Sequence, residues 1–229
     1  MEDRISIIEE PSYRERIRVF EDRIHAGRLL AKKLLENRDF FDIVFAVPSG
    51  GVPIGFTIAE TFNTALDLVL TRKLHLPWDS EVGFGAVAPD GSMVLNEPLV
   101  KYLRLKEDTI RECLRIELGE IERRQKVFRN NKPFPDIKDR KVIVVDDGLA
   151  SGYSMLAATK YLKKSLPKEV VVAVPTGSNS ALKLIQPFCD KIYCLNVRSG
   201  SFFAVADAYK IWYDLGDDEV LSFLRRIHA

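Results

Sequence analysis

The stretch VIVVDDGLASGYSM, Val142 to Met155, decides the fold of this chain. A run of β-branched residues has the length of a buried strand, and it ends on two adjacent acids, Asp146 and Asp147. Small residues and a hydroxyl follow, and a helical pattern begins after them. A strand that runs through a glycine-bearing turn into a helix is typical of an α/β domain.

The same alternation continues on both sides of this stretch. Upstream, FEDRIHAGRLLAKKLLEN from Phe20 predicts a helix, DIVFAV a strand, VPIGFTIAETF a helix and ALDLVL a strand. Downstream, EVVVAV, NSALKLI and KIYCL predict a strand, a helix and a strand. The strands are continuous apolar runs, as expected when helices cover both faces of a sheet. We therefore predict an α/β fold, three layers deep, with a mostly parallel central sheet in a single domain over residues 1–229.

The middle and the end of the chain carry additional elements. GFGAVA and SMVLN flank Pro89-Asp90-Gly91, which predicts a β-hairpin within a flap at about 74–96. An apolar stripe over 110–128 predicts a long helix within an insertion at about 97–130. The tail, about 200–229, has a final helix that opens with three acids at 217–219. The basic cluster of Arg123, Arg124, Lys126 and Arg129 is interpreted as a solvated helix face.

Composition limits the function. The 229 residues include 34 Lys and Arg against 33 Asp and Glu, so neither nucleic acid nor a membrane surface is an expected partner. Three cysteines and three histidines show no zinc spacing, and Cys113, Cys189 and Cys194 are expected to be buried thiols. MEDRISIIEE lacks the apolar core of a signal peptide, and no run is long enough to span a bilayer. A cytoplasmic location is the expectation.

Three loops are expected at the carboxyl edge of the sheet, where parallel sheets bind ligands: 48–51, 71–81 and 146–154. In the last, Gly148 and Gly152 permit a tight turn, and main-chain N–H groups of residues 150–154 start a helix. With the hydroxyls of Ser151 and Ser154 they suit a phosphate monoester. Asp146 and Asp147 would repel that phosphate but can accept hydrogen bonds from vicinal sugar hydroxyls. A ribose 5-phosphate satisfies both parts.

The other two loops are open to two interpretations each. In VPSGGVPIG, Gly50 and Gly51 let main-chain N–H groups approach a second anion, or form only a tight turn. Arg72 and Lys73 could neutralise a pyrophosphate, or form an ordinary surface pair. The motifs GxxxxGK[ST], HExxH and GxSxG are absent, and no GxGxxG follows a strand.

VIVVDDGLASG resembles the signature for 5-phosphoribosyl diphosphate (PRPP) in type I phosphoribosyltransferases, where an apolar strand runs into two acids and a Thr/Ser-Gly loop. FEDRIHAGRLLAKKL, VPSGGVPIGFTIA, LTRKL, VLNE, VVAVP and FFAVADAYKIWYDL are similar to a bacterial and archaeal subfamily of that family. The resemblance covers nearly the whole chain from Phe20. It implies transfer of the phosphoribosyl group of PRPP to a nitrogenous acceptor, with release of pyrophosphate.

The resemblance also implies a role for each loop. Asp146 and Asp147 would hold the ribose, and the 5-phosphate would be bound by Gly148, Ala150, Ser151, Gly152, Tyr153 and Ser154. Ser49, Gly50, Gly51, Arg72 and Lys73 would bind the pyrophosphate. The two acids and the two cations would also carry catalysis, under a mobile flap. Mg²⁺ would arrive on PRPP without direct protein ligands.

One position departs from the expectation that the resemblance sets. An arginine is expected before the paired glycines, where this chain has Ser49, and a hydroxyl cannot replace a guanidinium as a charge partner. This departure favours one alternative, a PRPP- or nucleotide-binding regulator without transfer activity. A third possible function is that of a phosphoribosyl hydrolase or a phosphatase-like enzyme. For the oligomeric state, the resemblance to the family implies a homodimer.

The acceptor stays open in the sequence. Aromatic side chains that could stack on a planar base lie in the flap, the hairpin and the tail: Trp78, Phe84, Phe203, Tyr209 and Trp212. For each of them, ordinary packing is the simpler interpretation.

Overall fold

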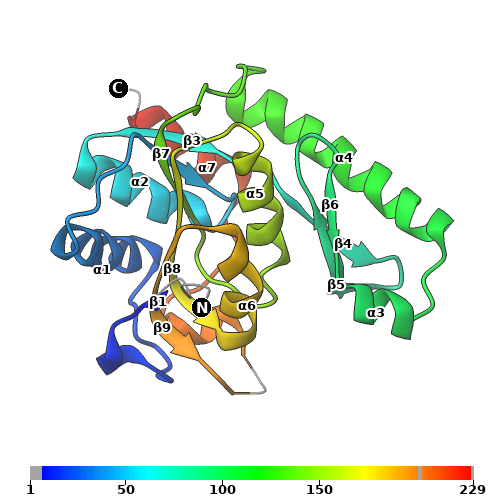
Figure 1. Cartoon of the computed structure of the whole chain (residues 1–229), viewed down its shortest axis with the longest axis horizontal. Coiled ribbons are helices and arrows are strands. Elements are labelled where there is room, and N and C mark those ends of the chain that lie inside the picture. Colours follow the sequence, from blue (N-terminus) through cyan, green and yellow to red (C-terminus); the bar gives the residue numbers. More distant parts are fainter. Residues whose placement is uncertain (1–6, 201–202, 228–229) are drawn as a thin grey trace.

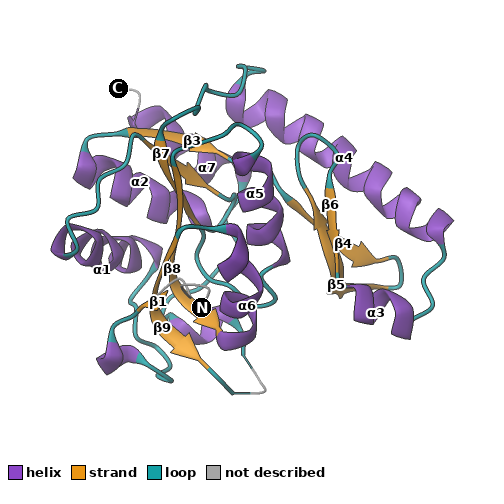
Figure 2. Ribbon diagram, viewed as in Figure 1, coloured by secondary structure: helices purple, strands orange, loops and turns teal. Residues whose placement is uncertain are grey.

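A six-stranded parallel sheet forms the centre of the computed structural model, which describes residues 7–200 and 203–227. The strand order is β1-β9-β8-β7-β2-β3, and every neighbouring pair is parallel (Figure 2). The strands are β1 (Ile7–Ile8), β2 (Ile43–Ala46), β3 (Ala65–Leu68), β7 (Lys141–Val145), β8 (Glu169–Ser178) and β9 (Lys191–Arg198). The predicted α/β class with a mostly parallel sheet is confirmed. The edge strand β1 was not predicted, because two residues carry no periodicity.

Helices cover both faces of this sheet, and α1 and α2 lie on the opposite side from α5 and α6 (Figure 1). Their bounds are α1 (Arg23–Glu36), α2 (Gly51–Phe62), α5 (Tyr153–Lys163) and α6 (Asn179–Ile185). Alternate residues of β7 serve the two layers: Val142 and Val144 pack with α5 and α6, whereas Ile143 and Val145 pack with α1 and α2. This burial on both faces explains the continuous apolar runs.

A second, three-stranded antiparallel sheet extends from one side of the molecule. It consists of β4 (Arg72–Leu76), β5 (Asp79–Val87) and β6 (Met93–Leu95), in the order β4-β5-β6. The pairing of β5 with β6 confirms the predicted hairpin. The predicted loop at 71–81 is wrong, because Leu74 and Leu76 alternate into the core and make 72–76 a strand.

The base of the hairpin is part of the core. Phe84, Ala86 and Ala88 are fully buried, whereas residues 77–81, which form the turn after β4 and the start of β5, are a continuous exposed run. Phe84 therefore packs rather than faces a ligand.

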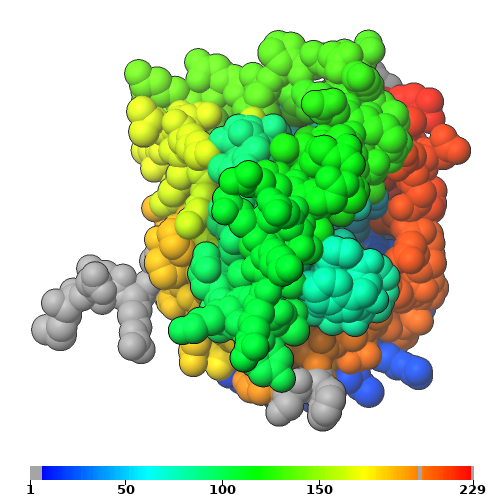
Figure 3. All heavy atoms as spheres, turned by 90° about the vertical axis from the view of Figure 1, so that its right-hand side faces the viewer, coloured from blue at the N-terminus to red at the C-terminus, as the bar shows by residue number. Residues whose placement is uncertain are grey.

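Helix α4 (Glu107–Arg129) crosses the outside of the small sheet, next to α3 (Glu97–Tyr102), and forms much of the face in Figure 3. The expected solvated basic face is only partly correct. Arg123 is exposed, but the side chain of Arg124 is 14% exposed and that of Arg129 is 4% exposed. Arg129 is buried because it pairs with Asp67 and lies over the ring of Phe134, contacts that a helical pattern cannot reveal.

The remaining elements close the fold. Helix α7 (Asp217–Ile227) begins at the predicted acids and packs against α2. The described chain also has short 3-10 turns, η1 (Pro11–Tyr13), η2 (Gln186–Phe188) and η3 (Val205–Ala208). The three cysteines are free and buried, as predicted. None of the described helices combines the length and the apolar composition needed to cross a bilayer. The start of the chain up to residue 6, with Phe202 and His228, lies outside the described residues.

Candidate active site

Two of the predicted loops meet because β2 and β7 are neighbours. Ala46 and Val145 are in register, so the loop after β2 and the loop after β7 leave the same edge of the sheet side by side. From β2 the sheet continues outward to β3, and from β7 it continues the other way to β8 and β9. The crevice at such a reversal is the usual ligand site of open α/β sheets.

Gly50 and the carboxylate of Asp147 are in direct contact across this crevice. A Cβ atom at Gly50 would lie 1.9 Å from Asp147 Oδ2, so the close approach requires glycine. The loop before Gly50 contains a cis peptide bond between Pro48 and Ser49. The second glycine of the pair, Gly51, is the first residue of α2 and donates to the Val47 carbonyl oxygen.

Asp147 is fixed from two sides. The Arg23 Nε–H donates to Asp147 Oδ2 over 2.9 Å, and the Tyr209 hydroxyl donates to the Asp147 carbonyl oxygen over 2.6 Å. Arg23 is 7% exposed, its Nη1–H donates to the Tyr213 carbonyl oxygen, and its guanidinium lies 3.9 Å from the centroid of the Trp212 ring. One arginine at the start of α1 therefore joins the acid to the C-terminal tail.

The two acids differ electrostatically. Burial raises the pKa of the Asp146 carboxyl well above its ordinary value, and the charge of Asp147 raises it further. Burial also raises the pKa of Asp147, but the guanidinium of Arg23 opposes that shift. The guanidinium of Arg23 therefore favours the ionised form of Asp147.

The loop after β7 forms one cavity, of about 180 Å³. Gly152 has φ +83°, which favours glycine, and it precedes α5, whose first N–H groups receive no side-chain cap. The loop is held in place by main-chain hydrogen bonds between Leu149 and the end of β8. Such a concave helix start suits an anion. The predicted site residues that line the cavity are Lys73, Asp146, Asp147, Gly148, Ala150, Ser151, Gly152 and Ser154.

The loop after β2 borders a second cavity, of about 450 Å³. Its walls include Ser49, Gly50, Arg72, Lys73, Asp146, Asp147 and Ser154. The two cavities share both acids, with Lys73, Ser154 and Trp212. The structure thus brings together most residues that the sequence singled out. Gly51 and Tyr153 line neither cavity, and the Tyr153 side chain packs against the core.

The two predicted cations are not equivalent. The Arg72 Nε–H donates to Glu117 Oε2 over 2.8 Å, so an acid on α4 already neutralises this guanidinium. The Lys73 ammonium forms no ion pair within the described part of the chain, and its charge lowers the pKa of both Asp146 and Asp147. The Thr71 hydroxyl beside them is buried without a hydrogen-bond partner. Lys73 is therefore the group best placed to bind an anion in the larger cavity.

Several wall residues were not predicted. Arg23, His75, Arg124 and Asp214 line the larger cavity, and Val205 lines the smaller. These residues reach the cavity through contacts between segments that are far apart in the sequence, which local patterns do not predict. Only His75, in the predicted loop at 71–81, and Arg124, in the predicted helix at 110–128, lay in segments that the sequence had singled out. Of the aromatic candidates, Trp212 lines both cavities, Tyr209 is 3% exposed, and Trp78 is exposed outside them. Phe203 lies against the guanidinium of Arg198.

The acids offer few ligands to a divalent cation. Mg²⁺ takes six oxygen ligands, whereas the described residues contain no cluster of three or more acidic, histidine or cysteine side chains that could hold a metal. Two buried carboxylates with raised pKa values nevertheless favour a nearby positive charge. The site therefore fits an ion whose remaining ligands come from a bound phosphate compound and water.

The protein is an open α/β protein, and both cavities lie at the loops after β2 and β7, where the strand order of the sheet reverses. Proteins of this class typically bind their ligands at that point. The chain belongs to the phosphoribosyl transferase domain family, whose model matches residues 20–208. The crystal structure of the Thermus thermophilus protein TT1426 superposes with a TM-score of 0.72 at 31% identity, covering 90% of this chain and 98% of that one. A protein of Aquifex aeolicus shares the fold at 14% identity, with a TM-score of 0.50 over 87% and 84% of the two chains.

A curated relative gives a further comparison. A Mycobacterium tuberculosis protein, named provisionally as a phosphoribosyl transferase, is 34% identical over 212 residues and 93% of this chain. The match covers 48% of that relative, so this chain spans about half the length of the curated relatives it matches. The predicted family is thereby confirmed.

Proposed function

We propose that this protein transfers the 5-phosphoribosyl group of PRPP to a nitrogenous, nucleobase-like acceptor and releases pyrophosphate. The observation that carries the proposal is the pair of acids shared by the two cavities. Asp146 and Asp147, which can accept hydrogen bonds from ribose hydroxyls, then lie between the start of α5, which suits an anion, and the wall that contains Lys73. PRPP has the same order of groups: phosphate, ribose and pyrophosphate.

In this proposal the 5-phosphate lies at the loop of 148–154, where α5 supplies free N–H groups. Asp147, held by Arg23, accepts hydrogen bonds from the ribose hydroxyls, and Asp146 completes the contact. The pyrophosphate occupies the larger cavity beside Ser49, Gly50 and Lys73.

The reaction breaks the bond between C1 and the pyrophosphate oxygen and forms a bond from C1 to the acceptor nitrogen. Negative charge develops on the leaving oxygen, and Lys73 on the cavity wall would stabilise it. Positive charge develops on the sugar, next to the two carboxylates. Mg²⁺ bound to PRPP would supply further charge neutralisation, and Asp146 and Asp147 are the residues that could contact it.

Arg23 has a positioning role in this proposal. Because it bonds to Asp147 and to the Tyr213 carbonyl oxygen, it sets the acid and the tail as one unit. The indole of Trp212, stacked on its guanidinium, forms part of the wall next to the reacting sugar. The tail thereby helps to exclude water from the reacting carbon.

The experiment measures two quantities on one set of variants: PRPP–Mg²⁺ binding by calorimetry, and pyrophosphate release with a panel of nucleobases. We expect saturable binding that the double substitution Asp146→Asn/Asp147→Asn abolishes. Asp218→Asn, an exposed acid at the start of α7, is the matched control and should bind normally. Absence of binding at millimolar PRPP would overturn the proposal.

A second candidate is a PRPP-binding regulator without transfer activity. The neutralisation of Arg72 by Glu117, together with Ser49 in the pyrophosphate loop, favours it. In that case PRPP binds with the same dependence on the acids, but no acceptor in the panel releases pyrophosphate.

A further inference from the structure

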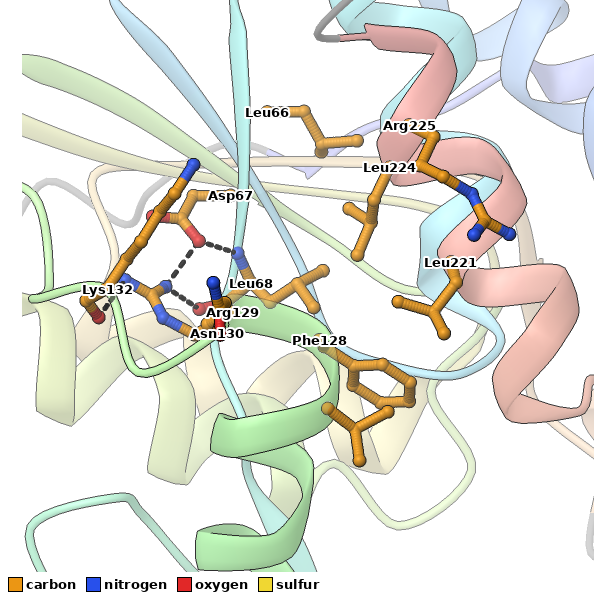
Figure 4. A pocket seen from close by; sticks show the side chains of 11 residues that line it. Leu66, Asp67, Leu68, Phe128, Arg129, Asn130, Lys132, Leu221, Leu224 and Arg225 are labelled. Carbon is orange, nitrogen blue, oxygen red and sulfur yellow. Dashed lines mark hydrogen bonds and ion pairs between the residues drawn. The ribbon is translucent and has the colours of Figure 1, made fainter.

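A third cavity, of about 400 Å³, lies between the edge strand β3, the last turn of α4 and helix α7 (Figure 4). None of the residues that line it lines either cavity of the candidate active site. Its volume is in the range of sites for small molecules, roughly 300–1,000 Å³.

This cavity has two chemically different ends. One end is apolar and is formed by Leu66, Leu68, Val127, Phe128, Leu221 and Leu224. The other end is polar and contains Arg129, Asn130 and Lys132, beside Asp67. Figure 4 shows Asp67, Arg129, Asn130 and Lys132 on one side, and Phe128 with Leu221, Leu224 and the further basic residue Arg225 of α7 on the other.

The polar end carries uncommitted donors. Arg129 forms an ion pair with Asp67 and donates to the Leu68 and Pro133 carbonyl oxygens, but its Nε–H is buried without a hydrogen-bond partner. The Lys132 ammonium forms no ion pair within the described residues. Since Asp67 balances Arg129, the charge of Lys132 leaves this end positive.

We propose that this cavity is a second ligand site, for a small amphiphilic anion. A carboxylate or similar oxyanion would accept a charge-assisted hydrogen bond from the exposed Lys132 ammonium, and the net positive charge of the lining would favour it further. An aliphatic or aromatic body would lie against Phe128, Leu221 and Leu224, where burial of apolar surface favours binding. An uncharged apolar ligand would leave the polar end unsatisfied, and a cation would meet like charge.

A ligand here would contact the candidate active site indirectly. Phe128 lies 5.8 Å from the guanidinium of Arg124, one turn back on α4, and Arg124 lines the larger cavity. Strand β3, which the ligand would touch at Leu68, continues through three residues to Arg72. Binding at the second site does not depend on the proposed transfer reaction, and any effect on PRPP affinity would be a separate measurement.

The test uses the dye anilinonaphthalene sulfonate, an aromatic anion that fluoresces in apolar surroundings. We expect one saturable site, displaced by octanoate but not by octylamine, which has the same body and the opposite charge. Lys132→Gln should weaken binding roughly tenfold, the loss of one charge-assisted hydrogen bond. The matched control Lys138→Gln removes an exposed lysine outside the cavity and should change nothing.

A second variant tests the apolar end. Val127 is 37% exposed at the cavity wall, so Val127→Trp fills space without overpacking the core and should block the dye. Ile116→Trp, on the same helix and 55% exposed, is its control. Absence of saturable binding, equal displacement by octanoate and octylamine, or unchanged binding in Val127→Trp would each overturn the proposal.

Discussion

Replacing Arg23 with methionine tests the reasoning about the acid pair most directly. The substitution keeps an apolar stem of similar length but removes the guanidinium that pairs with Asp147, donates to the Tyr213 carbonyl oxygen and stacks on Trp212. Asp147 would remain in place, with its side chain 14% exposed and next to Asp146.

The size of the loss in stability depends on whether Asp147 can be solvated or protonated once Arg23 is gone. Removing one partner of a buried ion pair costs about 3–5 kcal/mol when the other charge has no escape. Asp147 is partly solvated and can take up a proton, so we expect a loss of about 2–3 kcal/mol at neutral pH.

The pH dependence has a definite sign. Arg23 opposes the upward shift in the pKa of Asp147, so its removal raises the folded-state pKa further above the unfolded value. A raised folded pKa gives stability that is present at low pH and lost as pH rises through that pKa. The difference in stability between the variant and the wild type should therefore be smallest below about pH 4, the ordinary range of an aspartate, and should widen as pH increases.

The assay is urea unfolding at several pH values for four proteins: wild type, Arg23→Met, Asp147→Asn and the double variant. In the double variant the unpaired charge is gone, so its loss at neutral pH should be smaller than that of Arg23→Met alone. A destabilisation by Arg23→Met that is the same at pH 4 and pH 8 would refute the reasoning. So would a double variant that loses the sum of the two single losses.

Other predictions follow from the same geometry. Gly50→Ala places a methyl group 1.9 Å from Asp147 Oδ2, and calorimetry should show PRPP affinity reduced at least about tenfold, whereas retained affinity would contradict the contact. Asp146→Asn removes a buried carboxyl with a raised pKa, so thermal melting should show a gain in stability at pH 8 and none near pH 4. Lys73→Met should weaken pyrophosphate binding more than Arg72→Met does, since Glu117 already neutralises Arg72; the reverse order, measured by competition against PRPP, would exclude this assignment.

Much of the fold followed from local patterns. Continuous apolar runs predicted β2, β7, β8 and β9, because strands covered on both faces need apolar side chains throughout. The site loops were also predicted from local sequence. Glycines directly after a strand indicate a tight turn, and paired acids beside them indicate groups that can accept hydrogen bonds from a ligand. The strand β4 was missed, since its alternation of Leu74 and Leu76 is only five residues long and contains Arg72 and Lys73.

By itself, then, the sequence determined the α/β class and the position of the two acids and the glycine-bearing loop directly after β7; phosphate binding by that loop stays a prediction. Only the tertiary structure decided which charges are free. Arg23 and Asp147 are 124 residues apart, Arg72 and Glu117 are 45 apart, and Arg129 and Asp67 are 62 apart. Each pairing arises from the packing of helices against the sheets, and no periodicity or motif encodes a contact between side chains so distant in the chain.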